Sequence, residues 1–256
     1  MADSKIHVPE GSEMPLDGAE SDCSYLPGRS SLMQYRWAYA LTTERYRHLL
    51  ERGWRRFGRT LFRPLCRGCN ECQSLRIDVA AFRASKSQRR TRNRNSDVSF
   101  EVGPVTITAE HLDLYNAYHL DMHERRGWPL NMITAEDYAN SFLEGDFSFS
   151  REFQYRLNGR LVAVGLVDHA LDVMSSLYFY HAPEYRQNGL GVYSVLCEQQ
   201  YALQQNVRWL YLGYYIRDCR SMNYKNRYQP HQILNHYGPF DEPAQWSEPK
   251  DCDVAK

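Results

Sequence analysis

The feature that most constrains the fold is a series of β-strand patterns centred on Asn158-Gly159. Asn-Gly is the preferred two-residue turn of a β-hairpin, and strand patterns flank it at 152–157 and 161–168. A third strand pattern follows at 173–180, and then a glycine-containing turn opens a helix over 190–205. Three consecutive strands followed by a helix and a further strand predict an α+β fold with a mixed, mostly antiparallel sheet.

Composition and pattern divide the chain into four parts. Residues 1–22 are acidic and poor in large apolar side chains, which predicts a mobile tail, and residues 241–256 predict a second, polar tail. Residues 23–103 predict a small basic N-terminal subdomain that contains the cysteine cluster, and residues 104–240 predict the main domain. Further elements are predicted as helices at 43–52, 108–124, 134–143 and 221–228 and as strands at 74–79, 97–102 and 209–213. Residues 54–63 predict either one strand or a hairpin that turns at Gly58.

The composition is that of a globular protein in a reducing compartment. Of the 256 residues, 43% are hydrophobic and 24% are charged, which excludes a disordered chain. The longest apolar stretches, such as 161–167, are far shorter than the ~20 residues of a membrane span. The first 22 residues lack the basic start and apolar run of a secretory signal, and seven cysteines is an odd number. We therefore expect a cytoplasmic protein with reduced or metal-bound thiols.

The zero net charge conceals a strongly basic segment. Between Arg45 and Arg94 there are 15 basic and 3 acidic side chains, and no acid lies between Val79 and Ser96. The densest basic run comprises Arg83, Lys86, Arg89, Arg90, Arg92 and Arg94. Such a run is either a solvated face or a surface for a polyanion. Its position beside a cysteine cluster and many aromatic residues favours contact with nucleic acid.

Cys66, Cys69 and Cys72 form a C-x2-C-x2-C knuckle. This spacing lets the sulfurs turn toward one centre, and Cys23 is the nearest upstream candidate for a fourth ligand. The alternatives are three reduced thiols in a loop, a zinc site and an iron–sulfur cluster, and the spacing slightly favours iron–sulfur over zinc. For Cys197 and Cys219 we expect core packing instead.

The glycine turn before the helix at 190–205 predicts an anion-binding loop. Arg186, Gly189 and Gly191 form an R-x-x-G-x-G pattern, in which backbone N–H groups and a helix N-terminus can approach an anion. In this context the pattern resembles the acyl-donor loop of the GNAT acyltransferase superfamily, which normally holds the pyrophosphate of acyl-CoA. The resemblance implies a GNAT-like fold for the main domain.

Six segments together resemble the aminoacyl-tRNA–protein transferase family. They are Cys23–Arg29 (CSYLPGR), the cysteine knuckle at 66–72, Phe82–Arg90 (FRASKSQRR), Ser176–Tyr180 (SLYFY), Tyr211–Ile216 (YLGYYI) and Cys219–Lys225 (CRSMNYK). The resemblance covers roughly residues 23–237. Members transfer an amino acid from a charged tRNA to the N-terminal Asp or Glu of a protein and so mark it for N-degron proteolysis.

The short length and the single cysteine of the first motif resemble the bacterial leucyltransferase branch. Eukaryotic arginyltransferases are longer and carry two cysteines there, whereas this chain has Leu26 at the second position. The resemblance favours leucine as donor group, with arginine as the alternative, and implies a cysteine-bound metal. A CoA-dependent N-acetyltransferase and a non-enzymatic nucleic-acid-binding module are the competing functions.

The chemistry of this transfer sets the remaining expectations. The donor ester is already activated, so neither ATP nor CoA is needed, and the work is to position two substrates, accept a proton and stabilise an oxyanion. Asp168 is the candidate base or amine anchor, with a structural role as the alternative. Tyr178 and Tyr180 share a strand face and either stack on the CCA end or pack in the core. The candidates for contacting tRNA or the acceptor carboxylate are Lys86, Arg89, Arg90 and Lys225. We expect a monomer.

Overall fold

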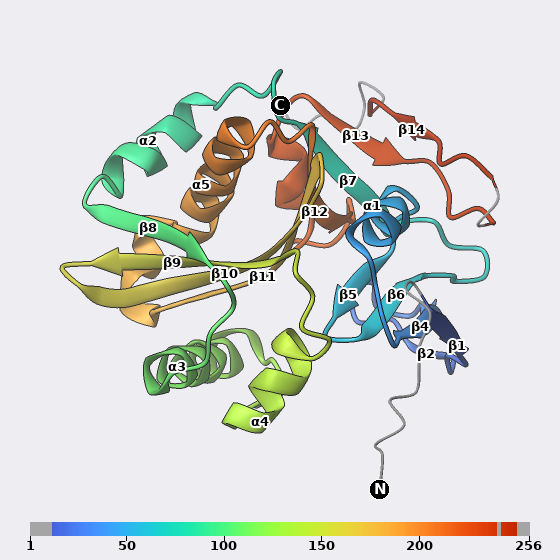
Figure 1. Ribbon diagram of the computed structural model, residues 1–256, viewed down its shortest axis with the longest axis horizontal. Coiled ribbons are helices and arrows are strands. Elements are labelled where there is room, and N and C mark those ends of the chain that lie inside the picture. The colour runs from blue at the N-terminus through green and yellow to red at the C-terminus, as the bar shows by residue number, and fades with distance from the viewer. Residues whose placement is uncertain (1–11, 240–241, 250–256) are drawn as a thin grey trace, which may run out of the picture.

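A mixed eight-stranded sheet is the centre of the computed structural model, which describes residues 12–239 and 242–249 (Figure 1). Its order is β14-β13-β7-β12-β11-β10-β9-β8. The strands are β7 (Gln73–Asp78), β8 (Val98–Gly103), β9 (Ser150–Leu157), β10 (Arg160–Ala170), β11 (Val173–His181), β12 (Trp209–Tyr215), β13 (His231–Leu234) and β14 (Trp246–Ser247). Only the β11–β12 pair is parallel within this sheet of the described chain. The predicted α+β class with a mostly antiparallel sheet is confirmed, as is the β9–β10 hairpin at Asn158-Gly159.

Helices cover both faces of the large sheet (Figure 1). On one face lies α5 (Leu190–Gln204), with α2 (Lys86–Arg94) packed against it. On the other face lie α3 (Ala109–Arg126), the short α4 (Ala135–Tyr138) and the π-helix that continues it at Ala139–Leu143. The predicted helix at 221–228 is a shorter 3-10 helix, Asn223–Arg227.

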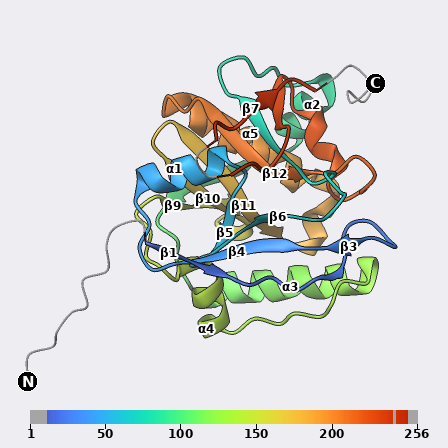
Figure 2. The same cartoon turned by 90° about the vertical axis from the view of Figure 1, so that its right-hand side faces the viewer.

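A second, four-stranded sheet lies beside one end of the large sheet, together with α1 (Thr43–Glu51) (Figure 2). Its order is β1-β4-β6-β5, and two short strands of two residues each, β2 and β3, form a separate pair that flanks it. The strands are β1 (Glu13–Leu16), β2 (Ser21–Asp22), β3 (Ser30–Ser31), β4 (Met33–Ala38), β5 (Arg55–Phe57) and β6 (Thr60–Pro64). The β5–β6 hairpin turns at Gly58, where φ is +49°, as predicted.

The predicted boundaries between the four parts of the chain need three corrections. Within the expected mobile tail, residues 12–22 contain β1 and β2, and the buried Glu13 carboxylate of β1 pairs with Arg36 and Arg45. The boundary at residue 103 falls inside the large sheet, because β7 and β8 belong to it. Within the predicted polar tail, β14 pairs with β13, and the Trp246 indole donates to the Glu51 carbonyl at 2.9 Å. Residues 1–11, 240–241 and 250–256 lie outside the described chain.

The basic run forms a helix that the sequence analysis did not predict. In α2 only Gln88 is buried, so the apolar periodicity that identifies a helix is absent. A capping box supplies the start signal instead: Ser85 accepts from the Gln88 backbone N–H, and the Gln88 side chain accepts from the Ser85 N–H.

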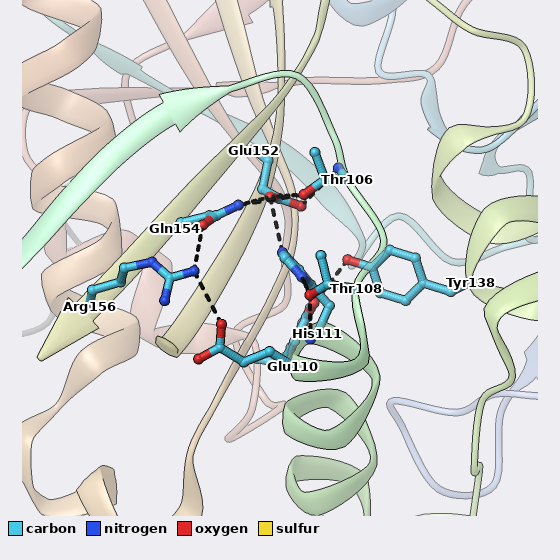
Figure 3. A network of polar contacts seen from close by, with 9 residues as sticks. Thr106, Thr108, Glu110, His111, Tyr138, Glu152, Gln154 and Arg156 are labelled. Atoms are coloured by element: carbon cyan, nitrogen blue, oxygen red, sulfur yellow. Dashed lines mark hydrogen bonds and ion pairs between the residues drawn. The ribbon is translucent and has the colours of Figure 1, made fainter. Parts of the chain in front are cut away.

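A buried polar network fastens the start of α3 to β9 (Figure 3). The carboxylate of Glu152, 1% exposed, contacts the Thr106 hydroxyl at 3.0 Å, the His111 imidazole at 3.1 Å and the Gln154 amide at 2.7 Å. Thr108 caps the helix through the His111 backbone N–H.

Across the described residues, no helix combines the length and apolar character that a bilayer span would require.

Candidate active site

The parallel strands β11 and β12 separate into a fork near the middle of the large sheet. They pair only from Val173 to Ser175 and from Trp209 to Tyr211. Beyond this point β12 carries a bulge before Gly213, whose φ of +80° is a conformation that glycine adopts readily. A fork between two parallel strands exposes backbone groups within the sheet, and such groups can bind a substrate.

The guanidinium of Arg55 bridges this fork from the small sheet. It donates to the Ser175 hydroxyl at 2.7 Å and to the Ser176 carbonyl, both on β11. A Cβ added at Gly213 on β12 would lie 3.3 Å from the same guanidinium. The glycine therefore permits the close approach of Arg55, and β5 places a buried cation between the two strands.

Glu198 reaches the fork from α5 on the opposite side. Its Oε1 accepts from the Ser194 hydroxyl at 3.0 Å, and the Ser176 hydroxyl lies 3.4 Å away. Its Oε2 is buried and has no hydrogen-bond partner among the described residues. Burial raises the pKa of this carboxyl to about 7, while the serine hydroxyls and Arg55 oppose the shift.

Lys225, a predicted substrate-contacting residue, is buried beside the fork. Its ammonium donates to the Tyr214 carbonyl of β12 at 2.7 Å. Burial and then the nearby Arg55 charge lower the pKa of Lys225 to about 7. Lys225 is therefore a buried basic residue, and its contact with an acceptor stays a prediction. By contrast Lys86, Arg89 and Arg90 are exposed on α2, so they are not buried readers of a carboxylate.

Asp168 lies in a closed ion pair, which corrects its predicted role as a base. The carboxylate is 0% exposed, and the Arg56 guanidinium donates to both of its oxygens. Ser150 adds a contact at 3.3 Å. Because both oxygens are paired with a cation, the structural role that the sequence analysis left open is the one that this geometry supports.

The two predicted catalytic tyrosines face α3 rather than α5. Tyr180 is 0% exposed, and its hydroxyl bonds to that of Tyr138 at 2.9 Å. A buried ring cannot stack on a nucleotide, so the stacking role is wrong for Tyr180. Tyr178 is half-buried and contacts the imidazole of His119 at 2.8 Å, and its role stays a prediction.

The predicted donor loop lies at the open side of the fork, where the 3-10 helix Pro183–Asn188 leads into α5. Gly189 has a φ of +70°, as a glycine turn requires. Gly191 is different, because an added Cβ would make only ordinary contacts with Phe179 at 3.8 Å and its φ is not positive. A side chain at Gly191 would therefore meet neither a strained backbone nor a close neighbour. Arg186 forms an ion pair with Asp121 of α3.

The basic helix α2 is fastened to this loop. Arg94 donates to the Gln187 carbonyl and Asn95 donates to the Asn188 carbonyl, each at 2.9 Å. The basic side chains of this region are all exposed: Arg83, Lys86, Arg89, Arg90, Arg92 and Arg94. The exposed positive face therefore adjoins the start of α5.

The four predicted metal ligands lie near one another. Burial raises the pKa of the Cys72 thiol to about 12, and the nearby Cys66, Cys23 and Cys69 sulfurs add to this shift. Each of the four is half-buried. However, the Cys66 sulfur bonds to the Leu32 backbone and the Cys69 sulfur to Arg29. In the part of the chain that the structure describes, no group of three or more His, Cys, Asp or Glu side chains is arranged to hold a metal ion.

Arg55 and Glu198 escaped the sequence analysis. Gly213 inside a strand pattern is a signal for a close backbone approach, but it does not identify the approaching residue. Ser194 and Glu198 stand four residues apart in a helix whose buried side is otherwise largely apolar, so this spacing marks a polar pair facing the core. Cys197 and Cys219 are buried in the core as expected, although Cys219 packs beside Cys23 and Cys72.

Comparison with known proteins agrees with the motif resemblance. A family model described as the N terminus of arginine-tRNA-protein transferase matches residues 21–90, and the model of its C terminus matches residues 110–235. The aspartate/glutamate leucyltransferase of Campylobacter jejuni (strain 81-176) is 36% identical over 215 residues, which cover 84% of this chain and 90% of the relative. The enzyme of the same name from Helicobacter hepaticus is 34% identical over 224 residues, 88% of this chain and 93% of the relative.

Among solved structures, L-PGS from Bacillus licheniformis aligns with a TM-score of 0.41 at 13% identity, over 78% of this chain and 69% of that one. The sequence relatives, by contrast, match over nearly their whole length, and the two family models together cover most strands of both the small sheet and the forked sheet. The chain therefore belongs to the arginine-tRNA–protein transferase family of aminoacyltransferases.

Proposed function

We propose that this protein transfers leucine from leucyl-tRNA to the α-amine of proteins that begin with Asp or Glu. One observation carries the proposal: the basic helix α2, the start of α5 and the fork between β11 and β12 lie next to one another. A polyanion held on α2 lies beside the loop that opens the fork. The preference for leucine over arginine rests on the names of the curated relatives.

The exposed face of α2 suits the phosphate backbone of tRNA. Its side chains are long, cationic and solvated, and such contacts provide affinity without reading bases. The start of α5 adds the partial positive charge of a helix N-terminus, which favours a phosphate or the terminal ribose oxygens. Together these features support tRNA as the donor carrier, with no need for CoA or ATP.

The fork suits the acceptor, because two basic side chains are buried there. Arg55 is 8% exposed and Lys225 is 6% exposed. A side-chain carboxylate of N-terminal Asp or Glu, once removed from water, requires a paired cation. The reaction exchanges an ester for an amide, so the main contribution of the chain is to hold the two substrates close together in the orientation that the reaction needs.

The overall topology supports a GNAT-like arrangement, in which antiparallel strands lead through β11 and α5 into the parallel strand β12. A thiolate-bound metal at Cys23, Cys66, Cys69 and Cys72 is a separate proposal. Four half-buried sulfurs have the donor chemistry of zinc and iron–sulfur sites, but two of them are engaged by Arg29 and Leu32. No step of the transfer described above uses a metal.

The experiment is to offer the purified protein leucyl- and arginyl-tRNA with peptides that differ only at their first residue. Peptides beginning with Asp and Glu should gain one leucine, identified by mass, and those beginning with Asn, Lys or Arg should not. Arginine addition to the same acceptors would replace leucine as the donor. Acetylation from acetyl-CoA, with no transfer from either tRNA, would overturn the proposal.

A further inference from the structure

One oxygen in the fork lacks a partner although its surroundings are closed. Glu198 is 1% exposed, and its Oε2 is both buried and unpaired among the described residues, while Oε1 is held by Ser194. A buried carboxylate oxygen without a donor costs free energy, and native structures usually satisfy such groups. The unpaired oxygen therefore points to a ligand that donates a hydrogen bond.

The position of this oxygen selects the kind of donor. Ser176, which contacts Oε1, follows directly on the last paired residue of β11, so Glu198 lies at the base of the fork. Arg55 contacts Ser175 and Ser176 at the same place, and Lys225 contacts Tyr214 across the fork. The site thus places one carboxylate beside the Arg55 cation, and the same cation lies close enough to Lys225 to influence its pKa. A carboxylate next to a cation matches a ligand carrying one ammonium and one carboxylate.

We propose that Glu198 Oε2 binds the α-ammonium group of the acceptor and takes its proton, while Arg55 and Lys225 face the acceptor side-chain carboxylate. The proposal rests on the proposed function and identifies the residue that prepares the nucleophile. An N-terminal Asp or Glu is the chemical class that presents both groups within a few bonds of each other.

The proton and bond changes follow from this placement. The ammonium gives one proton to Glu198, and the neutral amine attacks the ester carbonyl of aminoacyl-tRNA. The new C–N bond forms, the C–O bond to the terminal ribose breaks, and the ribose oxygen leaves with a proton that the attacking nitrogen loses. The proton on Glu198 then passes to water, so one amide, one ribose hydroxyl and one released proton balance the reaction.

The surroundings of Glu198 are consistent with a proton acceptor at neutral pH. Burial is the largest cause of its raised pKa of about 7, which lies near the range in which an α-ammonium loses its proton. The charged and titratable groups around it come from several elements: Arg55 of β5, Tyr155 of β9, Cys197 of α5, Tyr224 of the 3-10 helix, and Tyr228. Of these only Arg55 carries a charge at neutral pH, because burial raises the pKa values of Tyr155, Cys197, Tyr224 and Tyr228.

The test is the pH dependence of leucyl transfer in Glu198→Gln, which keeps the size of the side chain and a hydrogen bond to Ser194. We expect kcat to fall by a factor of about 10²–10⁴ at pH 7. The remaining rate should rise tenfold per pH unit toward the pKa of the free peptide amine, and retention of tRNA should be unchanged. The matched control is Glu152→Gln, another glutamate that is 1% exposed, which should keep the wild-type pH profile.

A second measurement separates chemistry from folding. Glu198→Gln protein with wild-type circular dichroism and tRNA binding, yet low kcat, supports the proposal. A wild-type rate and pH profile in Glu198→Gln would overturn it while leaving the transferase function intact. If the wild-type protein itself transfers nothing from either tRNA, the proposed function fails first, and the inference fails with it.

Discussion

The Arg56 guanidinium and the Asp168 carboxylate form a two-point ion pair with side chains that are 1% and 0% exposed. The Arg56 guanidinium also lies 4.9 Å from the centre of the Phe147 ring, and its Nη1 donates to the Gly58 carbonyl at 3.1 Å. The pair therefore joins the β5–β6 hairpin to the C-terminal part of β10. It fixes the hairpin that also carries Arg55, so we expect the pair to help position Arg55.

Removing one member of this pair should destabilise the protein strongly. We expect Asp168→Asn to lower the free energy of unfolding by about 3–5 kcal/mol, because it leaves the Arg56 charge buried without its partner. Urea unfolding measures this. The double variant Arg56→Met with Asp168→Leu should recover part of the loss. If Asp168→Asn instead has normal stability and no activity, Asp168 is a base after all.

The exposed arginines of α2 should control tRNA affinity. Arg89→Ala with Arg90→Ala should weaken tRNA binding and reduce the slope of log affinity against log salt by about 0.7–0.9 for each lost phosphate contact. Arg126, exposed on α3 at the other face of the large sheet, provides the control, and Arg126→Ala should leave the slope unchanged. Titration of labelled tRNA at several salt concentrations checks both. An unchanged slope in the double variant would place tRNA elsewhere.

Much of the fold could be predicted because its signals are local. Asn158-Gly159 and Gly58 fix hairpins through turn chemistry, and most strands of the large sheet follow from short-range pattern. The fork could not be predicted, since it depends on where β11 and β12 stop pairing and on an arginine from another sheet. Asp168 illustrates the limit: a carboxylate at the end of a strand has the same local pattern as a base or as half of an ion pair, and Arg56 decides which it is.

The two glycines of the donor loop should respond differently to substitution. Gly189→Ala places an L-residue at a φ of +70° and should cost about 1–2 kcal/mol of stability, together with activity. Gly191→Ala has room beside Phe179 and should keep wild-type stability. Thermal unfolding of the two variants is the comparison. A transfer rate that falls in Gly191→Ala without a loss of stability would show that the substrate itself approaches Gly191. A normal transfer rate would show that the turn serves only to begin the helix.

The cysteine proposal predicts metal in protein purified without oxygen. About one zinc ion or one iron–sulfur cluster per chain should be found, and Cys69→Ser should lower both the metal content and the thermal stability, because thiolate–metal bonds contribute to folding. Cys197→Ser, a buried cysteine of the α5 core, is the control and should lower stability without changing metal content. Metal-free protein together with an unaffected Cys69→Ser variant would reduce the cluster to packed thiols.

Glu198 should make stability depend on pH in a characteristic direction. Burial raises its pKa from about 4.5 in the unfolded chain to about 7 in the folded protein, so between these values the folded state binds more protons. Its contribution therefore lowers the free energy of unfolding as the pH rises from about 4.5 to 7 and stays unfavourable above 7. Glu198→Gln removes this cost and should be more stable than wild type at pH 8, by on the order of 3 kcal/mol, and equally stable near pH 4. Urea unfolding at the two pH values gives both differences, with Glu152→Gln as the comparison. If Glu198→Gln is destabilised equally at both pH values, Glu198 is an ordinary hydrogen-bonding residue. The free-energy cost expected of a buried, ionised carboxylate would then be absent.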